Sequence, residues 1–154
     1  MGLFDKMRGA VQAVTGGAAR VTIAYQPAVP CAGDTVIVSV TVTSTGGEVS
    51  AKGLFVDLAA SEAVRIRANT VPNLAQDVNA QHDTANHAFQ IAPAFVLAAN
   101  ETKVFEGALQ LPAGMQPSYT GHFTTHTWRI RARVDAFGND PDSGFAPIGL
   151  GLRG

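Results

Sequence analysis

The residues best suited to chemistry in this sequence are arginines that recur at every second position in two short stretches. Along an extended strand, side chains two residues apart lie on the same side. A guanidinium group binds carboxylates or phosphates through paired N–H donors. If the two stretches are neighbouring strands, we expect one basic face that binds a partner. The alternative is a solvated face whose arginines partly pair with Asp57, Asp135 or Glu106. The arginines are Arg65, Arg67, Arg129, Arg131 and Arg133.

Metal chemistry has weak support in the pattern of histidines, which are His82, His87, His122 and His126. A metal ion needs ligands that converge within about 2.0–2.1 Å of it. His122 and His126 are four residues apart at the entry of an expected strand, which separates them by roughly 13 Å. His82 and His87 lie with Asp83 in a polar segment that offers a weaker alternative. We therefore predict surface or loop histidines and no metal site.

The segment Gly138 to Gly144 has the composition of a turn and carries two carboxylates, Asp140 and Asp142. A calcium loop of the EF-hand type needs glycine at its sixth position and a glutamate at its end. Gly144 comes too early and no glutamate follows. We interpret the segment as a turn with exposed carboxylates, and the sequence leaves open whether Asp140 and Asp142 bind an ion.

Catalytic signatures are not apparent, and we expect a protein that is not an enzyme and has no cofactor. The sequence has no Gly-x-Ser-x-Gly elbow and no phosphate-binding glycine loop that opens a helix. Its one cysteine, Cys31, has no adjacent base and cannot form an intrachain disulfide. A single thiol fits a reducing compartment, so we expect a cytoplasmic protein.

Length and composition predict one folded domain that does not bind nucleic acid. The chain has 154 residues, of which 46% are hydrophobic and 15% charged, and its formal net charge is −1. A near-neutral chain creates no general attraction to nucleic acid or to anionic membranes. No stretch approaches the roughly 20 apolar residues of a membrane-spanning helix.

The N-terminal segment has apolar residues at helical spacing, which predicts a short amphipathic helix over Gly2 to Val14. We therefore divide the chain into a helix within residues 1–17 and a β-domain over residues 18–154. Such a helix could cap the domain, contact another copy or touch a membrane. The membrane alternative is weak, because stable anchoring usually takes more than one signal. The contact residues would be Leu3, Phe4, Met7 and Val11.

From Arg20 onward the apolar residues alternate with polar ones, which is typical of strands. The clearest examples are Thr35 to Thr43 and His126 to Phe137, where Trp128 falls in phase with the inward residues. The polar segment Asn69 to Ala85 is predicted to be a long loop. Turn residues separate the expected strands at regular intervals, which favours a two-sheet β-sandwich. The other expected strands are Arg20 to Tyr25, Lys52 to Ala60, Val64 to Ala68, Ala88 to Leu97, Thr102 to Leu111 and Phe145 to Leu152.

The sequence carries several short motifs around its tryptophan and near its beginning. Thr125-His126-Thr127 precedes the tryptophan of a strand that ends in Asp135, and Asp140-Pro141-Asp142 follows. An entry of the form Pro-Ser-Tyr-x-Gly, here Pro117 to Gly121, stands just before them. Further motifs are the opening Phe4, Lys6 and Met7, followed by Gly17 to Arg20, and the Gly33-Asp34 turn. Together these motifs resemble those of arrestin-like proteins, and in particular their bacterial sporulation-control group.

The resemblance implies an immunoglobulin- or arrestin-like sandwich that works as an adaptor or regulator and binds protein partners. It also implies a role in sporulation or stress-type regulation. Arrestin-like proteins usually carry two sandwiches in tandem, and this chain has residues for one. The alternative is a structural subunit that assembles into a homo-oligomer or fibre through an exposed edge strand. A carbohydrate- or ion-binding sandwich that uses the Asp140 turn is a third and weaker reading.

Overall fold

The computed structural model describes residues 9–15, 19–136 and 140–152, and all its regular elements are strands. The longest are β4 and β5, which form a hairpin and reach well beyond the length of their neighbours. The strands are β1 (Gly9–Thr15), β2 (Ala19–Gln26), β3 (Thr35–Ser44), β4 (Val49–Ile66), β5 (Val78–Ala92), β6 (Phe95–Leu97), β7 (Thr102–Gln110), β8 (Tyr119–Thr120), β9 (Thr124–Ala136) and β10 (Ala146–Ile148).

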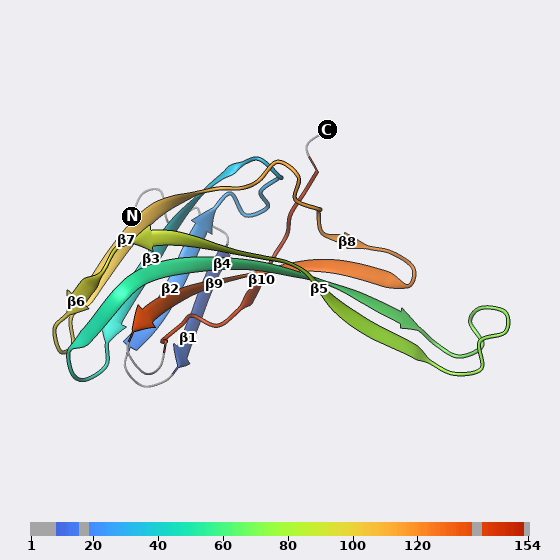
Figure 1. Cartoon of the computed structure of the whole chain (residues 1–154), viewed down its shortest axis with the longest axis horizontal. Coiled ribbons are helices and arrows are strands. Elements are labelled where there is room, and N and C mark those ends of the chain that lie inside the picture. The colour runs from blue at the N-terminus through green and yellow to red at the C-terminus, as the bar shows by residue number, and fades with distance from the viewer. Residues whose placement is uncertain (1–8, 16–18, 137–139, 153–154) are drawn as a thin grey trace.

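The strands form two antiparallel sheets that pack face to face, as Figure 1 shows. One sheet has the order β1-β2-β3-β7. The other has the order β10-β9-β4-β5, and the short strands β6 and β8 pair with β4 and β9. The predicted two-sheet β-sandwich is therefore confirmed.

The core lies between the sheets and follows the alternation of the sequence. Val36, Val38, Val40 and Val42 of β3 are all almost fully buried. From the opposite sheet, every second residue of β9 from Trp128 to Val134 is buried against them. The strands of both sheets therefore present one apolar face each, which is what drives the sheets together.

The hairpin of β4 and β5 continues past the end of the sandwich and forms an arm, the green and yellow-green ribbons on the right of Figure 1. We use this name for residues 62–84 together with the N-terminal end of β9, which pairs with β4 as far as Val64. No residue between Ser61 and Ala92 belongs to the fully buried apolar core. The arm is thus held by backbone pairing and by cross-strand contacts within one sheet.

The predicted N-terminal helix is wrong where the structure describes it. Residues 9–14 belong to β1, which pairs antiparallel with β2, so this segment is part of the four-stranded sheet. Val11 lies on this strand, opposite Ile23. A short run of apolar residues fits a helix or a strand equally well. This segment is a strand because it pairs with the edge of β2. Leu3, Phe4 and Met7 lie outside the described residues.

Two further predictions are wrong: the long loop from Asn69 to Ala85, and the division of β4 into two strands. The segment from Asn69 to Ala85 is irregular only as far as Asp77, after which β5 begins. The two strands expected on either side of Ser61 are one continuous strand, β4. In the arm both faces of the sheet meet solvent, so the sequence there lacks the apolar alternation that marks a half-buried strand.

Candidate functional site

Two of the predicted site arginines, Arg131 and Arg133, converge on one buried carboxylate. Asp57 of β4 stands opposite Arg131 in the register of β4 and β9, and its side chain is 6% exposed. Its Oδ2 accepts hydrogen bonds from Arg131 Nη2 at 2.8 Å and from Arg133 Nε at 3.0 Å. The hydrogen bond to Asp57 raises the pKa of Arg133 above its ordinary value. The predicted alternative of pairing with Asp57 is therefore what the structure shows.

Aromatic side chains and further polar groups occupy the remaining surface of these arginines. The ring of Phe145 lies 4.3 Å from Arg131 Cζ and 5.1 Å from Arg129 Cζ, within the range of cation–π contact. Arg129 also contacts Asp83, with Nη2 and Oδ1 3.7 Å apart. The ring of Phe55 lies against Arg133 in the same way, at 4.9 Å. The β9 arginines are thus largely engaged within the protein.

The other two predicted arginines, Arg65 and Arg67, lie apart from this cluster. The strands β4 and β9 are neighbours, as the hypothesis of a common face required. Arg129 stands opposite Ala59, however, and Arg65 is six residues farther along β4. This corresponds to roughly 20 Å of strand. The five arginines therefore do not form one patch, and both Arg65 and Arg67 are exposed near the end of the arm.

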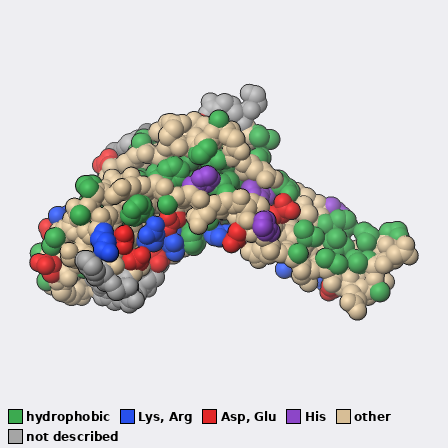
Figure 2. Space-filling model, in the orientation of Figure 1, with side chains coloured by type: hydrophobic (Ala, Val, Ile, Leu, Met, Phe, Trp, Pro, Cys, Tyr) green, Lys and Arg blue, Asp and Glu red, His purple; other side chains and the backbone are tan. Residues whose placement is uncertain are grey.

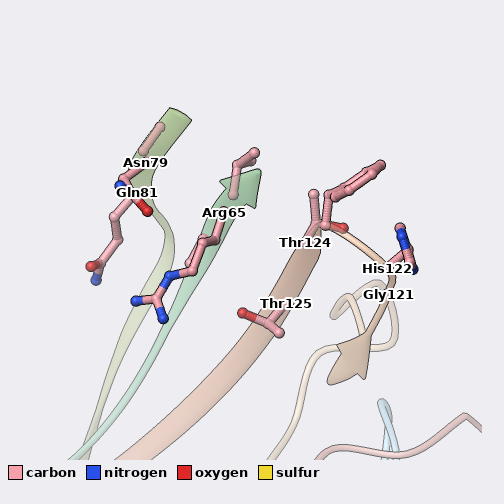
Figure 3. Close-up of a pocket in the computed structure, with 11 residues that line it drawn as sticks. Arg65, Asn79, Gln81, Gly121, His122, Thr124 and Thr125 are labelled. Atoms are coloured by element: carbon pink, nitrogen blue, oxygen red, sulfur yellow. The ribbon is translucent and has the colours of Figure 1, made fainter. Parts of the chain in front are cut away.

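A surface depression of about 620 Å³ lies beside Arg65 (Figure 3). Its floor includes Ala63, which stands between Gln81 of β5 and Thr125 of β9 in one cross-strand row. Because alanine is the smallest of the three side chains, this row is hollow at its centre. Arg65 and Asn79, which are partners in the register of β4 and β5, also line the depression.

The polar groups of this depression are mostly hydrogen-bond donors. A guanidinium, two carboxamides, two hydroxyls and an imidazole line it, and together they can offer several N–H and O–H groups to one bound oxygen-rich group. Among the described residues, no acidic side chain forms an ion pair with Arg65. Asp77 lines an adjoining hollow with Arg65 and Arg67, where its Oδ1 accepts a hydrogen bond from the Ala68 backbone N–H. The depression is therefore suited to an anion.

His126 fixes the base of the arm, a role that sequence reasoning missed. It is 1% exposed, and its Nδ1 lies 2.8 Å from the carbonyl oxygen of Pro117. Because a carbonyl only accepts, Nδ1 carries the proton and Nε2 accepts from the Thr84 hydroxyl at 2.7 Å. The prediction of a surface or loop histidine is wrong for this residue. The signal for this role in the sequence is that His126 is a polar residue in phase with the inward apolar residues of β9.

The predicted turn uses its two carboxylates to hold its own backbone. Asp140 Oδ1 accepts from the Ala136 N–H at 3.2 Å, and Asp142 Oδ1 accepts from the Gly144 N–H at 2.7 Å. Within the part of the chain that the structure describes, no three His, Cys, Asp or Glu side chains gather as metal ligands. The same described residues include no helix long and apolar enough to cross a membrane.

The arm has a free strand edge, which belongs to β5. Among the described strands, β5 ends its sheet and pairs with β4 alone. From Val78 to Thr84 every residue of β5 is exposed. Figure 2 shows hydrophobic side chains gathered on the arm, where Val78 is exposed and Val64 and Ile66 are half-buried. A strand edge with unpaired N–H and C=O groups is a template for pairing with another chain.

Comparison with known proteins gives a match at the level of structure. No family model matches the chain. A search of curated proteins also finds no match. Among solved structures, the chain is similar to Spo0M, a sporulation control protein from Bacillus subtilis, with a TM-score of 0.63 and 18% identity over 90% of this chain.

The two proteins share a fold. The match spans 51% of the Spo0M chain, so this sequence corresponds to about half the length of that protein. The arrestin-like sandwich that the sequence motifs indicated is therefore confirmed as a fold. At 18% identity the likeness carries no residue roles from Spo0M to this chain.

Proposed function

We propose that this protein is a non-enzymatic, arrestin-like regulator that binds a partner protein by adding a strand to the free edge of β5. The observation that supports this proposal most is the exposed edge from Val78 to Thr84, which stands clear of the sandwich. Backbone groups on such an edge provide affinity, and alternate side chains provide specificity. The similarity to Spo0M, a sporulation control protein, supports the regulatory part of the proposal, a role in sporulation. The cytoplasm is the compartment we propose because the sequence has a single cysteine.

Edge pairing is tested by placing a lysine on the edge, a device by which natural proteins prevent it. We choose Ala80→Lys, because Ala80 is exposed on the free part of β5. The matched control is Val104→Lys, which places the same charge at a 59% exposed position of β7 in the other sheet. The tagged full-length chain is used to capture partners, and the complex with each purified candidate is then measured by size-exclusion chromatography.

The proposal expects a stoichiometric complex that Ala80→Lys weakens at least about tenfold, a change of roughly 1.4 kcal/mol. Val104→Lys should leave that complex unchanged. Equal binding by the wild type and Ala80→Lys would contradict the proposal. A circular dichroism spectrum and a thermal melt of each variant confirm that it is folded.

Self-assembly is a second candidate, and the same edge favours it because a second copy can supply the added strand. Light scattering of the purified protein over a range of concentrations separates the two. A defined dimer or larger particle that Ala80→Lys dissociates would favour self-assembly. A mass equal to one chain at every concentration would exclude it.

A further inference from the structure

The Arg65 depression lies one strand away from the edge that the proposed function uses. Arg65 stands opposite Asn79 in the β4–β5 register, and Ala63 stands opposite Gln81. A strand added to β5 would lie about 4.8 Å from it and twice that distance from β4. Its outward side chains would therefore lie beside Asn79 and Gln81. In Figure 3 the Arg65 guanidinium is directed to the β5 side of its own strand, toward Gln81.

The cation of this depression, Arg65, has no acidic partner among the residues that the structure describes. Arg65 forms no ion pair with any described acidic residue, in contrast to Arg131 and Arg133, which share Asp57. Thr125 contributes a hydroxyl from β9, and Figure 3 shows its oxygen on the side of Arg65. The arm thus holds a cation and neutral donors around a hollow that is open to solvent.

We infer that this depression binds a carboxylate side chain of an acidic, extended segment of the partner protein. The inference rests on the proposed function, because strand addition to β5 is what brings such a side chain within reach. Arg65 binds the carboxylate through its N–H fork, and Gln81 and Thr125 donate to the same oxygens. Glutamate fits better than aspartate, since its longer side chain must extend across β5.

The charge of the site favours a carboxylate over a phosphate. A phosphate group brings a charge of about −1.5 to −2 near neutral pH and three acceptor oxygens. Of the arginine and lysine side chains described, only Arg65 lines the depression. One guanidinium balances one carboxylate and matches its two oxygens in a single plane.

The test uses seven-residue, fluorescein-labelled peptides of alternating Thr and Val with a central Glu, Gln or phosphoserine. Binding to the full-length chain is measured by fluorescence anisotropy. A fourth peptide carries the central Glu and N-methyl groups on alternate residues, which removes its backbone donors. The variant is Arg65→Gln, and its control is Arg20→Gln, the same change at an exposed position of β2 in the other sheet.

The inference expects the wild type to bind the Glu peptide at least about tenfold more tightly than the Gln peptide, because hydrogen bonds to charged groups are the strong ones. Arg65→Gln should remove this preference, and Arg20→Gln should keep it. Equal binding of the Glu and Gln peptides would overturn the inference and leave strand addition intact. Tighter binding of the phosphoserine peptide would overturn it as well.

Failure of the proposed function gives a different pattern. If no peptide binds, or if the N-methylated peptide binds as tightly as its parent, strand addition to β5 is wrong and the inference falls with it. Side-chain N–H signals of Arg65 in a heteronuclear spectrum provide a second readout, since they should shift with the Glu peptide and not with the Gln peptide.

Discussion

Asp57 determines how much positive charge the outer face of β9 presents to solvent. Its carboxylate is buried, and the two guanidinium groups that bind it are each about one quarter exposed. Neutralisation by Asp57 and stacking on Phe145 leave little of this charge for a partner. A count of arginines on the strand therefore overestimates its capacity to bind anions, and exposed Arg65 is the better candidate.

Replacing Asp57 by alanine should destabilise the protein by about 2–4 kcal/mol, because two clustered guanidinium groups lose their shared partner. Partial exposure of Arg131 and Arg133 keeps the cost below that of a fully buried pair. Urea denaturation followed by tryptophan fluorescence measures the change, since Trp128 is buried in the core.

The matched variant is Arg131→Gln, which leaves Asp57 bound to Arg133. We expect this variant to lose about 1–2 kcal/mol, clearly less than Asp57→Ala. An Asp57→Ala protein as stable as the wild type would show that the cluster contributes nothing to the fold.

The sequence could predict that these arginines share a face, but not which acid neutralises them. Alternation along β9 follows directly from the two-residue period of a strand. The pairing of Asp57 with Arg131 joins residues 74 positions apart. It depends on the register of β4 against β9, which no local pattern specifies. The candidate acids that the sequence offers, Asp57, Asp135 and Glu106, do include the correct one.

At the scale of elements, strands were predictable where one face is buried and not where both are exposed. The alternating valines of β3 and the series from Trp128 to Val134 in β9 gave these strands nearly correct bounds. β5 begins with seven exposed residues, so its first half carries no apolar period. Its strand conformation there comes from pairing with β4, a tertiary effect that overrides local composition.

A glycine sets how closely β7 approaches β5 at the side of the sandwich. A Cβ atom added at Gly107 would lie 3.0 Å from Cγ2 and 3.1 Å from Cδ1 of Ile91. Gly107→Ala should therefore destabilise the protein by about 1–3 kcal/mol through overpacking. Thermal and urea denaturation measure the effect.

The double variant Gly107→Ala with Ile91→Ala provides the control, since it removes the side chain that the new methyl group meets. Its loss of stability should be smaller than the sum of the two single losses. Gly46→Ala, where an added Cβ has no neighbour within 4 Å, should change stability by less than about 0.5 kcal/mol. Strict additivity of the two single changes would contradict the proposed contact.

At the scale of the whole molecule, the sandwich and the arm are separable in energetic terms. The fully buried apolar residues all lie outside the stretch between Ser61 and Ala92. A chain in which Val64 to Ala80 is replaced by Asn-Gly would join Ala63 to Gln81, which are already paired across the hairpin. Asn-Gly is a favoured two-residue hairpin turn.

We expect this shortened chain to fold with a change in stability of at most about 2 kcal/mol and to lose partner binding. Urea denaturation and the peptide assay measure the two properties. A second variant, shortened only in the loop between Arg67 and Asp77, keeps the strands and should still bind. Loss of cooperative unfolding in the first variant would show that the arm is needed for the fold.

The contact between Ile91 and Gly107 also limits the length of any segment that β5 can accept. β5 continues from the arm into the side of the sandwich, where β7 lies against it. The part of β5 that precedes this contact runs from Val78 to Gln90, which is roughly 44 Å of strand at about 3.4 Å per residue. If a segment adds to β5 as proposed, a segment longer than about thirteen residues must turn away where β7 lies against Ile91, so this contact would limit the length of chain that can pair with β5.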